Sequence, residues 1–203
     1  MITGKEAWCL SQEAAAVGRV LRAVGGFYRV ALDDGSTIDC RLSGRLKAGG
    51  ARARQGPVLP GDLVALDRSQ DTCILLDVMP RVTEMRRPAV ANVEFCVVVQ
   101  SITEPTPNLE MIDRVLVQAA SAGLTGVLCI SKADLASPEE IQQLIDPYRQ
   151  AGYGCVVTSA ISGEGLAELE SILAGRLSTL AGSSGVGKSR LLNSLCPEFG
   201  LRV

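Results

Sequence analysis

The residues with the clearest potential for chemistry form one run, GSSGVGKS, near the end of the sequence. This run fits G-x-x-x-x-G-K-[ST], a pattern whose backbone N–H groups wrap nucleotide phosphates at the start of a helix. In such a loop Lys188 reaches the β- and γ-phosphates and the hydroxyl of Ser189 binds Mg²⁺, so these two are the candidate catalytic residues. The residues predicted to contact the nucleotide here are Gly182, Ser183, Ser184, Gly185, Val186, Gly187, Lys188 and Ser189.

Two further polar segments follow apolar runs that predict strands. The run GVLCI leads into Ser131, Lys132 and Asp134, and GCVVT leads into Ser159 and Ala160. The Asp134 carboxylate would accept hydrogen bonds from N1–H and the 2-amino group of guanine, a donor pair that adenine lacks. The Lys132 stem would lie along the purine, and the Ala160 N–H would approach the guanine carbonyl oxygen. Each segment alone fits an ordinary loop equally well, but three motifs at consecutive strand ends favour one ligand site.

The elements that must position these motifs alternate between strands and helices. VEFCVVVQ is a near-continuous apolar run, typical of a strand buried on both faces. Asn108 and Ser137 are candidate N-caps of two helices, and another helix begins near Gly165. Repeated strand–helix units predict a parallel sheet covered by helices over residues 92–203. A glycine-rich turn before a core helix is the alternative for the phosphate loop, although its strand–loop–helix context argues against this.

Residues 14–80 have a different pattern of short alternating runs separated by turns. VGRVLRAV, FYRVAL, STIDCRL, LVAL and CILLDVM predict strands joined in part by tight hairpins. These strands favour a small closed barrel of the oligonucleotide-binding (OB) type, although another small barrel fits the same pattern. Residues 1–13 indicate a polar leader, and residues 81–91, with proline and several charged side chains, indicate a linker.

A basic segment lies between the third and fourth predicted strands of the barrel. It is rich in glycine and alanine and has no acidic residue between Cys40 and Gly61. Its candidate RNA-binding residues are Arg41, Arg45, Lys47, Arg52 and Arg54. Local positive charge suits a phosphate backbone, whereas charge alone fits a solvated loop equally well. Phe27 and Tyr28 are the aromatic candidates nearby, so the pattern gives no support for sequence-specific base reading.

Composition excludes several classes of protein. Apolar residues make up 47% of the chain, which is ample for a core, and the net charge of −2 gives no overall basicity. The seven cysteines include no C-x-x-C pair and histidine is absent, so a Cys/His zinc site cannot be built from this sequence. We find no signal peptide and no long apolar span, and we expect a cytoplasmic protein without a membrane partner.

The motifs resemble those of GTPases, in an unusual order. S-K-A-D-L resembles the N-K-x-D guanine-specificity motif, S-A-x-x-G-x-G-L the second base loop, and GSSGVGKS the first motif. Base motifs before the phosphate loop resemble the circularly permuted GTPases. The barrel in front and the segments RRPAVANVE and IDRVLVQAASAG resemble the ribosome small-subunit-dependent GTPase family, RsgA, over about residues 15–203.

This resemblance implies an OB-fold barrel followed by a circularly permuted α/β P-loop GTPase domain. It implies GTP and GDP as ligands with Mg²⁺, and GTP hydrolysis coupled to late maturation of the small ribosomal subunit. The small ribosomal subunit and its rRNA are the implied partners, and we expect a monomer. Catalysis would rest on positioning and charge neutralisation by Lys188 and Mg²⁺ bound to Ser189, with no covalent intermediate.

Two departures from the family pattern affect this interpretation. Ser131 stands where the family usually has Asn, whose amide contacts the base and braces the phosphate loop, so we expect weaker guanine affinity. The family continues past Val203 with a switch threonine, a D-x-P-G motif and a zinc domain. We therefore expect an incomplete GTPase domain, with Zn²⁺ only in the missing C-terminal domain. The alternative function is an RNA-binding assembly module that senses guanine nucleotide without hydrolysing it. A third possibility is an ATP-using P-loop enzyme, and Asp134 argues against it because adenine lacks the donor pair that this carboxylate would bind.

Overall fold

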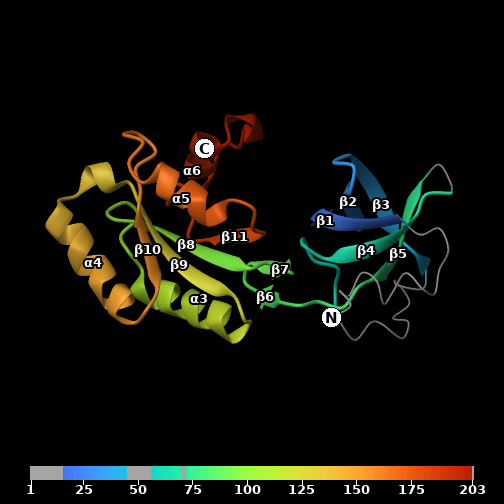
Figure 1. The fold of residues 1–203 in the computed structure, drawn as a ribbon, viewed down its shortest axis with the longest axis horizontal. Helices are drawn as coiled ribbons and strands as arrows, with labels where there is room; N and C mark the ends of the chain where they lie inside the picture. Colours follow the sequence, from blue (N-terminus) through green and yellow to red (C-terminus); the bar gives the residue numbers. More distant parts are fainter. Residues whose placement is uncertain (1–15, 45–55, 70–71, 203) are drawn as a thin grey trace. The chain divides into compact units, whose positions relative to one another are not determined.

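The structure is a computed structural model that describes residues 16–44, 56–69 and 72–202. Figure 1 shows the strands and helices in chain order. Within these ranges, no helix combines the length and the apolar character that crossing a membrane requires.

The chain divides into two units. The first unit extends to Glu84 and includes Ala89–Asn92. The second unit contains Met85–Pro88 and the residues from Val93 onward. The chain therefore enters the second unit at Met85, returns to the first at Ala89, and enters the second again at Val93.

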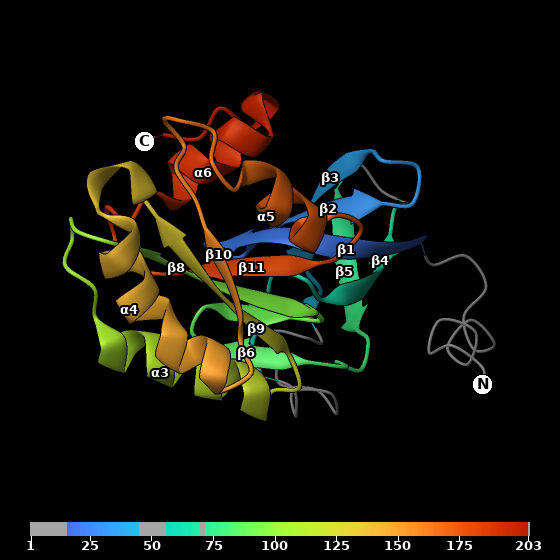
Figure 2. The same cartoon turned by 60° about the vertical axis from the view of Figure 1, so that its left-hand side comes forward.

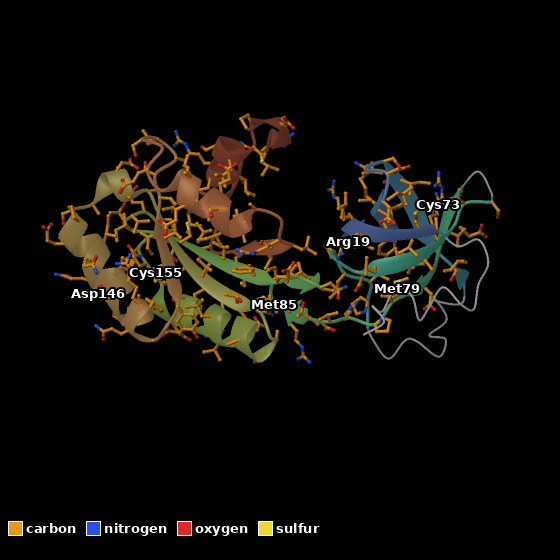
Figure 3. The ribbon with its side chains drawn as sticks, viewed as in Figure 1. Arg19, Cys73, Met79, Met85, Asp146 and Cys155 are labelled. Atoms are coloured by element: carbon orange, nitrogen blue, oxygen red, sulfur yellow. The ribbon has the colours of Figure 1, made fainter. Side chains whose placement is uncertain are left out.

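Five short strands in the first unit close into a barrel, in the order β1-β2-β3-β5-β4. They are β1 (Ala16–Val24), β2 (Phe27–Leu32), β3 (Thr37–Leu42), β4 (Leu63–Asp67) and β5 (Cys73–Val78). Apolar side chains such as Val20, Val30 and Leu75 are buried in the barrel core. Figure 3 labels Arg19 on β1, whose Nη1 donates to the carbonyl of Gly61 at 3.0 Å. A closed barrel removes free strand edges, and its presence confirms the predicted N-terminal barrel.

A short hairpin follows the barrel, where the sequence indicates only a linker. Its strands are β6 (Glu84–Arg86) and β7 (Ala89–Ala91). Just before it, Nε and Nη2 of Arg81 donate to the two carboxylate oxygens of Asp62, each at 2.8 Å. The Asp62 side chain is fully buried and that of Arg81 is nearly so, which makes the pairing essential for both charges. Charged residues and proline indicate a linker over residues 81–91, and the structure shows that Arg81 in this segment is buried against Asp62.

The second unit contains a parallel sheet with the strand order β10-β9-β8-β11. Its strands are β8 (Phe95–Ser101), β9 (Thr125–Ser131), β10 (Gly154–Val157) and β11 (Ser178–Ala181). Val97 and Val98 point to opposite faces of β8 and are both fully buried, as the continuous apolar run predicts. The predicted parallel sheet is thus confirmed, with β11 at one edge and β10 at the other.

Helices cover both faces of this sheet (Figure 1, Figure 2). They are α3 (Leu109–Ser121), α4 (Pro138–Gln150), α5 (Leu166–Leu173) and α6 (Lys188–Leu195). The pair α3 and α4 lies on one face and the pair α5 and α6 on the other, where Leu169 and Leu191 pack with Val97. Figure 3 labels Asp146 on α4 and Cys155 on β10, the strand beside this helix.

Local sequence accounts for where two of the helices begin. The side chain of Asn108 accepts a hydrogen bond from the Met111 N–H at 2.9 Å and caps α3. Ser137 and Glu140 form a capping box at the start of α4, in which each side chain bonds the backbone N–H of the other. Both N-caps agree with those predicted from the sequence.

Candidate functional site

The phosphate loop connects β11 to α6 and packs closely against the neighbouring strand β8. A Cβ atom at Gly182 would lie 2.3 Å from the carbonyl oxygen of Val99, and the φ of Gly182 is +149°. Gly185 and Gly187 also have positive φ values, +82° and +94°. Glycine is therefore required at Gly182 both for its backbone conformation and for the close approach of the two chains.

Lys188 is the first residue of α6, and its side chain reaches back over the loop. Its ammonium donates to the carbonyl oxygens of Gly182, at 2.8 Å, and Ser183, at 2.7 Å. Burial lowers the pKa of Lys188. An ammonium group has three N–H donors, so one remains for an anionic ligand. Ser189 follows in the first helical turn, where backbone N–H groups lack intrahelical acceptors.

Ser131, at the end of β9, ties the first base loop to the phosphate loop. Its Oγ lies 2.5 Å from the carbonyl oxygen of Val186 and 3.3 Å from that of Gln100. A hydroxyl has a single proton, and the shorter distance indicates that Ser131 donates it to Val186. The serine therefore retains the brace to the phosphate loop that the resemblance attributes to an asparagine.

The two predicted base loops are joined by a hydrogen bond between their side chains. Asp134 lies in a short 3₁₀ helix, η3 (Ala133–Leu135), and its Oδ1 accepts from the hydroxyl of Ser159. Oγ of Ser159 in turn accepts from the N–H groups of Ile161 and Ser162, both at 3.2 Å. Ser159 is completely buried, so the orientation of the Asp134 carboxylate is fixed from inside the protein.

A cavity of about 180 Å³ lies where the two base loops meet the phosphate loop and α6. Its lining residues are Ser131, Lys132, Asp134, Leu135, Ala160, Ile161, Gly187, Arg190 and Leu191. Four of the five residues predicted for base contacts therefore share one cavity, and the fifth, Ser159, lies directly behind Asp134. A wider groove of about 670 Å³ runs along α3 and β11 but reaches only Gly182 and Ser183 of the phosphate loop.

Four of the lining residues, Leu135, Ile161, Arg190 and Leu191, were not predicted from the sequence, nor was the contact that Lys132 makes outside the cavity lining. The ammonium of Lys132 donates to the carbonyl of Glu104, which belongs to the loop after β8. Arg190 lines the cavity from the first turn of α6. Its position directly after the K-S pair is the signal that could have identified it. The Glu104 contact has no such signal, because a backbone carbonyl can come from any residue type.

The predicted RNA-binding residues are described only in part. Arg41 is exposed at the end of β3, and its guanidinium lies 4.9 Å from the ring centre of Phe27. Phe27 is 54% exposed. The residues of the basic segment that lie outside the described residues are Arg45, Lys47, Arg52 and Arg54.

Two family models match this chain. One is described as RsgA GTPase and matches residues 78–203, and the other is described as RsgA N-terminal domain and matches residues 17–73. The chain belongs to the RsgA GTPase family. The matched regions contain the sheet with its three motifs and most of the barrel.

Curated RsgA relatives carry the name small ribosomal subunit biogenesis GTPase RsgA. The protein from Moorella thermoacetica is 44% identical over 187 residues, covering 92% of this chain and 62% of the relative. That from Caldanaerobacter subterraneus subsp. tengcongensis is 38% identical over 186 residues, covering 92% of this chain and 61% of the relative. The chain thus spans about three fifths of the length of these relatives.

Two solved structures resemble this RsgA family member over nearly its whole length. YjeQ from Thermotoga maritima has a TM-score of 0.76 and 30% identity, covering 94% of this chain and 67% of the other. YloQ, described as a circularly permuted GTPase, has a TM-score of 0.69 and 29% identity, covering 93% and 67%. Here too the loops after β9 and β10 precede the phosphate loop after β11. The fold is a barrel followed by a circularly permuted α/β GTPase domain, as predicted.

Proposed function

We propose that this chain is the guanine-nucleotide-binding part of a GTPase that couples GTP hydrolysis to late maturation of the small ribosomal subunit. The observation that carries this proposal is the single cavity in which both base loops meet the phosphate loop. The name shared by the curated relatives supports the ribosomal role. A factor of this kind would work as a cytoplasmic monomer, with the subunit and its rRNA as partners.

Base selection would rest on Asp134 and Ala160. The carboxylate of Asp134 is held through Oδ1 by Ser159, which leaves its other oxygen and the remaining lone pair of Oδ1 to accept from N1–H and the 2-amino group of guanine. The N–H of Ala160 would donate to the guanine carbonyl oxygen. Adenine offers the opposite pattern at these positions and would leave the carboxylate facing an acceptor in place of a donor.

Phosphate binding would rest on the loop from Gly182 to Lys188. The absence of Cβ atoms at its three glycines would let the loop backbone approach the phosphates, and the third N–H of Lys188 would donate to the β- or γ-phosphate. The half-buried hydroxyl of Ser189 fits Mg²⁺, because this ion prefers oxygen ligands and keeps several of its waters. Bound Mg²⁺ would neutralise charge on the phosphate oxygens.

The barrel would bind the RNA. Arg41 above the exposed ring of Phe27 forms a cationic and aromatic platform, which suits a base next to a phosphate. The basic segment with Arg45, Lys47, Arg52 and Arg54 would add contacts to the phosphate backbone.

Nucleotide titrations with Asp134→Asn test the base assignment. Xanthine carries a carbonyl where guanine has its 2-amino group, and an amide can donate to that carbonyl whereas a carboxylate cannot. We expect GDP affinity to fall by about 10²-fold and xanthosine diphosphate affinity to rise, because charge-assisted hydrogen bonds are exchanged. Lys188→Ala is the phosphate-side control, and should weaken both nucleotides alike. Equal binding of ATP and GTP by the unmodified chain would overturn the assignment.

Phosphate release from GTP tests the hydrolytic step. It should be measured with and without small ribosomal subunits, and subunits should accelerate it. Tight guanine binding with no release in either condition would contradict hydrolysis and support the alternative of a nucleotide-sensing RNA-binding module.

A further inference from the structure

Arg190 brings a cationic side chain into the base cavity from the helix that follows the phosphate loop. It lies in the first turn of α6 and is exposed, and it lines the cavity together with Ser131, Asp134 and Ala160. Among the described residues, its guanidinium has neither an ion-pair nor a hydrogen-bond partner. The donors of this guanidinium are therefore available to a ligand in the cavity.

The proposed guanine contacts leave the N7 acceptor of the base without a donor. Asp134 accepts from the N1–H and the 2-amino group, and the Ala160 N–H donates to O6, but N7 is an acceptor that neither of them reaches. The cavity-lining side chains that carry N–H or O–H donors are Ser131, Lys132 and Arg190. A side-chain donor to N7 must therefore come from one of these three.

Of these three side chains, Ser131 has no free donor and Lys132 is partly engaged. The single hydroxyl proton of Ser131 goes to the carbonyl oxygen of Val186, 2.5 Å away. One N–H of the Lys132 ammonium donates to the carbonyl of Glu104, which ties this side chain to the loop after β8 and leaves two of its N–H groups. All the donors of Arg190 are free among the described residues, and its planar guanidinium, unlike the point charge of an ammonium, matches the geometry of two adjacent acceptors such as N7 and O6.

We propose that Arg190 donates hydrogen bonds to the N7 and O6 edge of guanine and is a specificity-determining residue of this site. The inference rests on the proposed function, because it assumes that guanine occupies the cavity. Arg190 then supplies from α6 the base contact that the serine at position 131 cannot make. It also disfavours adenine, whose 6-amino group would face the guanidinium donors.

A nucleotide that lacks only the N7 acceptor tests this assignment. In 7-deaza-GDP a C–H group replaces N7, so the donor from Arg190 loses its partner. We expect the unmodified chain to bind 7-deaza-GDP about tenfold more weakly than GDP, the effect of one hydrogen bond of about 1.4 kcal/mol. In Arg190→Met, which keeps an unbranched side chain without donors, the two nucleotides should bind equally. Arg149→Met, on the outer surface of α4, is the matched control and should retain the tenfold difference.

The outcomes separate this inference from the function on which it rests. Tight GDP binding with equal affinity for 7-deaza-GDP in the unmodified chain overturns the role of Arg190 alone. A tenfold difference that persists in Arg190→Met also overturns it, because another donor then serves N7. Failure of the unmodified chain to bind any guanine nucleotide overturns the proposed function itself.

Discussion

At the scale of single residues, Ser131 shows how one proton can connect two motifs. Its hydroxyl donates to Val186 in the phosphate loop, so the base loop and the phosphate loop remain joined although the family asparagine is replaced. A longer amide could both brace the loop and contact the base, whereas a hydroxyl has one proton to give. The expectation of weaker guanine affinity from this replacement stays a prediction, and Arg190 is the residue that would offset it.

Two glycines in the second base loop form a matched pair for a stability test. Gly163 and Gly165 both have positive φ values, +84° and +65°. A Cβ at Gly163 would meet nothing within 4 Å, whereas one at Gly165 would lie 1.9 Å from the carbonyl oxygen of Val157. We expect Gly163→Ala to cost about 1–2 kcal/mol of unfolding free energy from backbone strain, and Gly165→Ala to cost more. Urea unfolding measures both.

The same pair also separates folding from binding. Gly165→Ala must displace the loop that carries Ser159 and Ala160, so it should also weaken GDP binding, while Gly163→Ala should leave binding nearly unchanged. Equal losses of stability in the two variants would show that strain alone, and not the close contact with Val157, governs this loop.

At the scale of elements, local sequence explains the helix starts but not the hairpin. Asn108 and Ser137 cap α3 and α4 through contacts within three residues, and such short-range patterns can be predicted from sequence. The hairpin of β6 and β7 follows a buried ion pair between Arg81 and Asp62. Asp62 lies in the connection before β4, and Arg81 lies in the connection between β5 and β6. No local pattern distinguishes this arginine from a solvated one.

The capping box of α4 makes part of the stability depend on pH. Hydrogen bonds from the N–H and hydroxyl of Ser137 lower the pKa of Glu140. Because the folded-state pKa is lowered, the stabilisation is complete above the usual pKa of glutamate and is lost as the pH falls through the lowered value. Urea unfolding between neutral and acidic pH should show this loss, and Glu140→Gln should remove it. Glu139→Gln changes the same charge on the same turn without breaking the box, and an equal effect there would contradict the assignment.

At the scale of the whole molecule, the order of the two units could be predicted from a change in periodicity. Short runs of alternating apolar and polar residues predict the strands of the barrel. Longer apolar runs that alternate with helical segments predict the parallel sheet, because the period of each pattern follows from the geometry of the backbone. The placement of Asp134, Ala160 and Lys188 around one ligand stays a prediction that the shared cavity supports. The position of Arg190 after the K-S pair is visible in the sequence, but its place in the cavity required the fold, because the packing of α6 against the base loops brings it there.

Two kinds of barrel variant should affect RNA binding differently. Neutralising Arg45, Lys47, Arg52 and Arg54 should flatten the dependence of RNA affinity on salt, because fewer counterions are released from the phosphates. Phe27→Ala should lower affinity while leaving the slope unchanged, because stacking involves no counterion. Filter binding over a range of salt concentrations measures both quantities, with Asp134→Asn as the control from the other unit. An unchanged slope in the neutralised variant would mean that the basic segment is only solvated.

The hydrogen bond from Ser159 to Asp134 has a consequence for the entropy of ligand binding. A surface carboxylate samples several rotamers, and ordering such a side chain on binding costs about 0.5–1.5 kcal/mol. Here a completely buried hydroxyl, itself fixed by two backbone N–H groups, holds the carboxylate before any ligand arrives. Asp134 is therefore preorganised, and the conformational entropy of its side chain is lost during folding and not during recognition of the base.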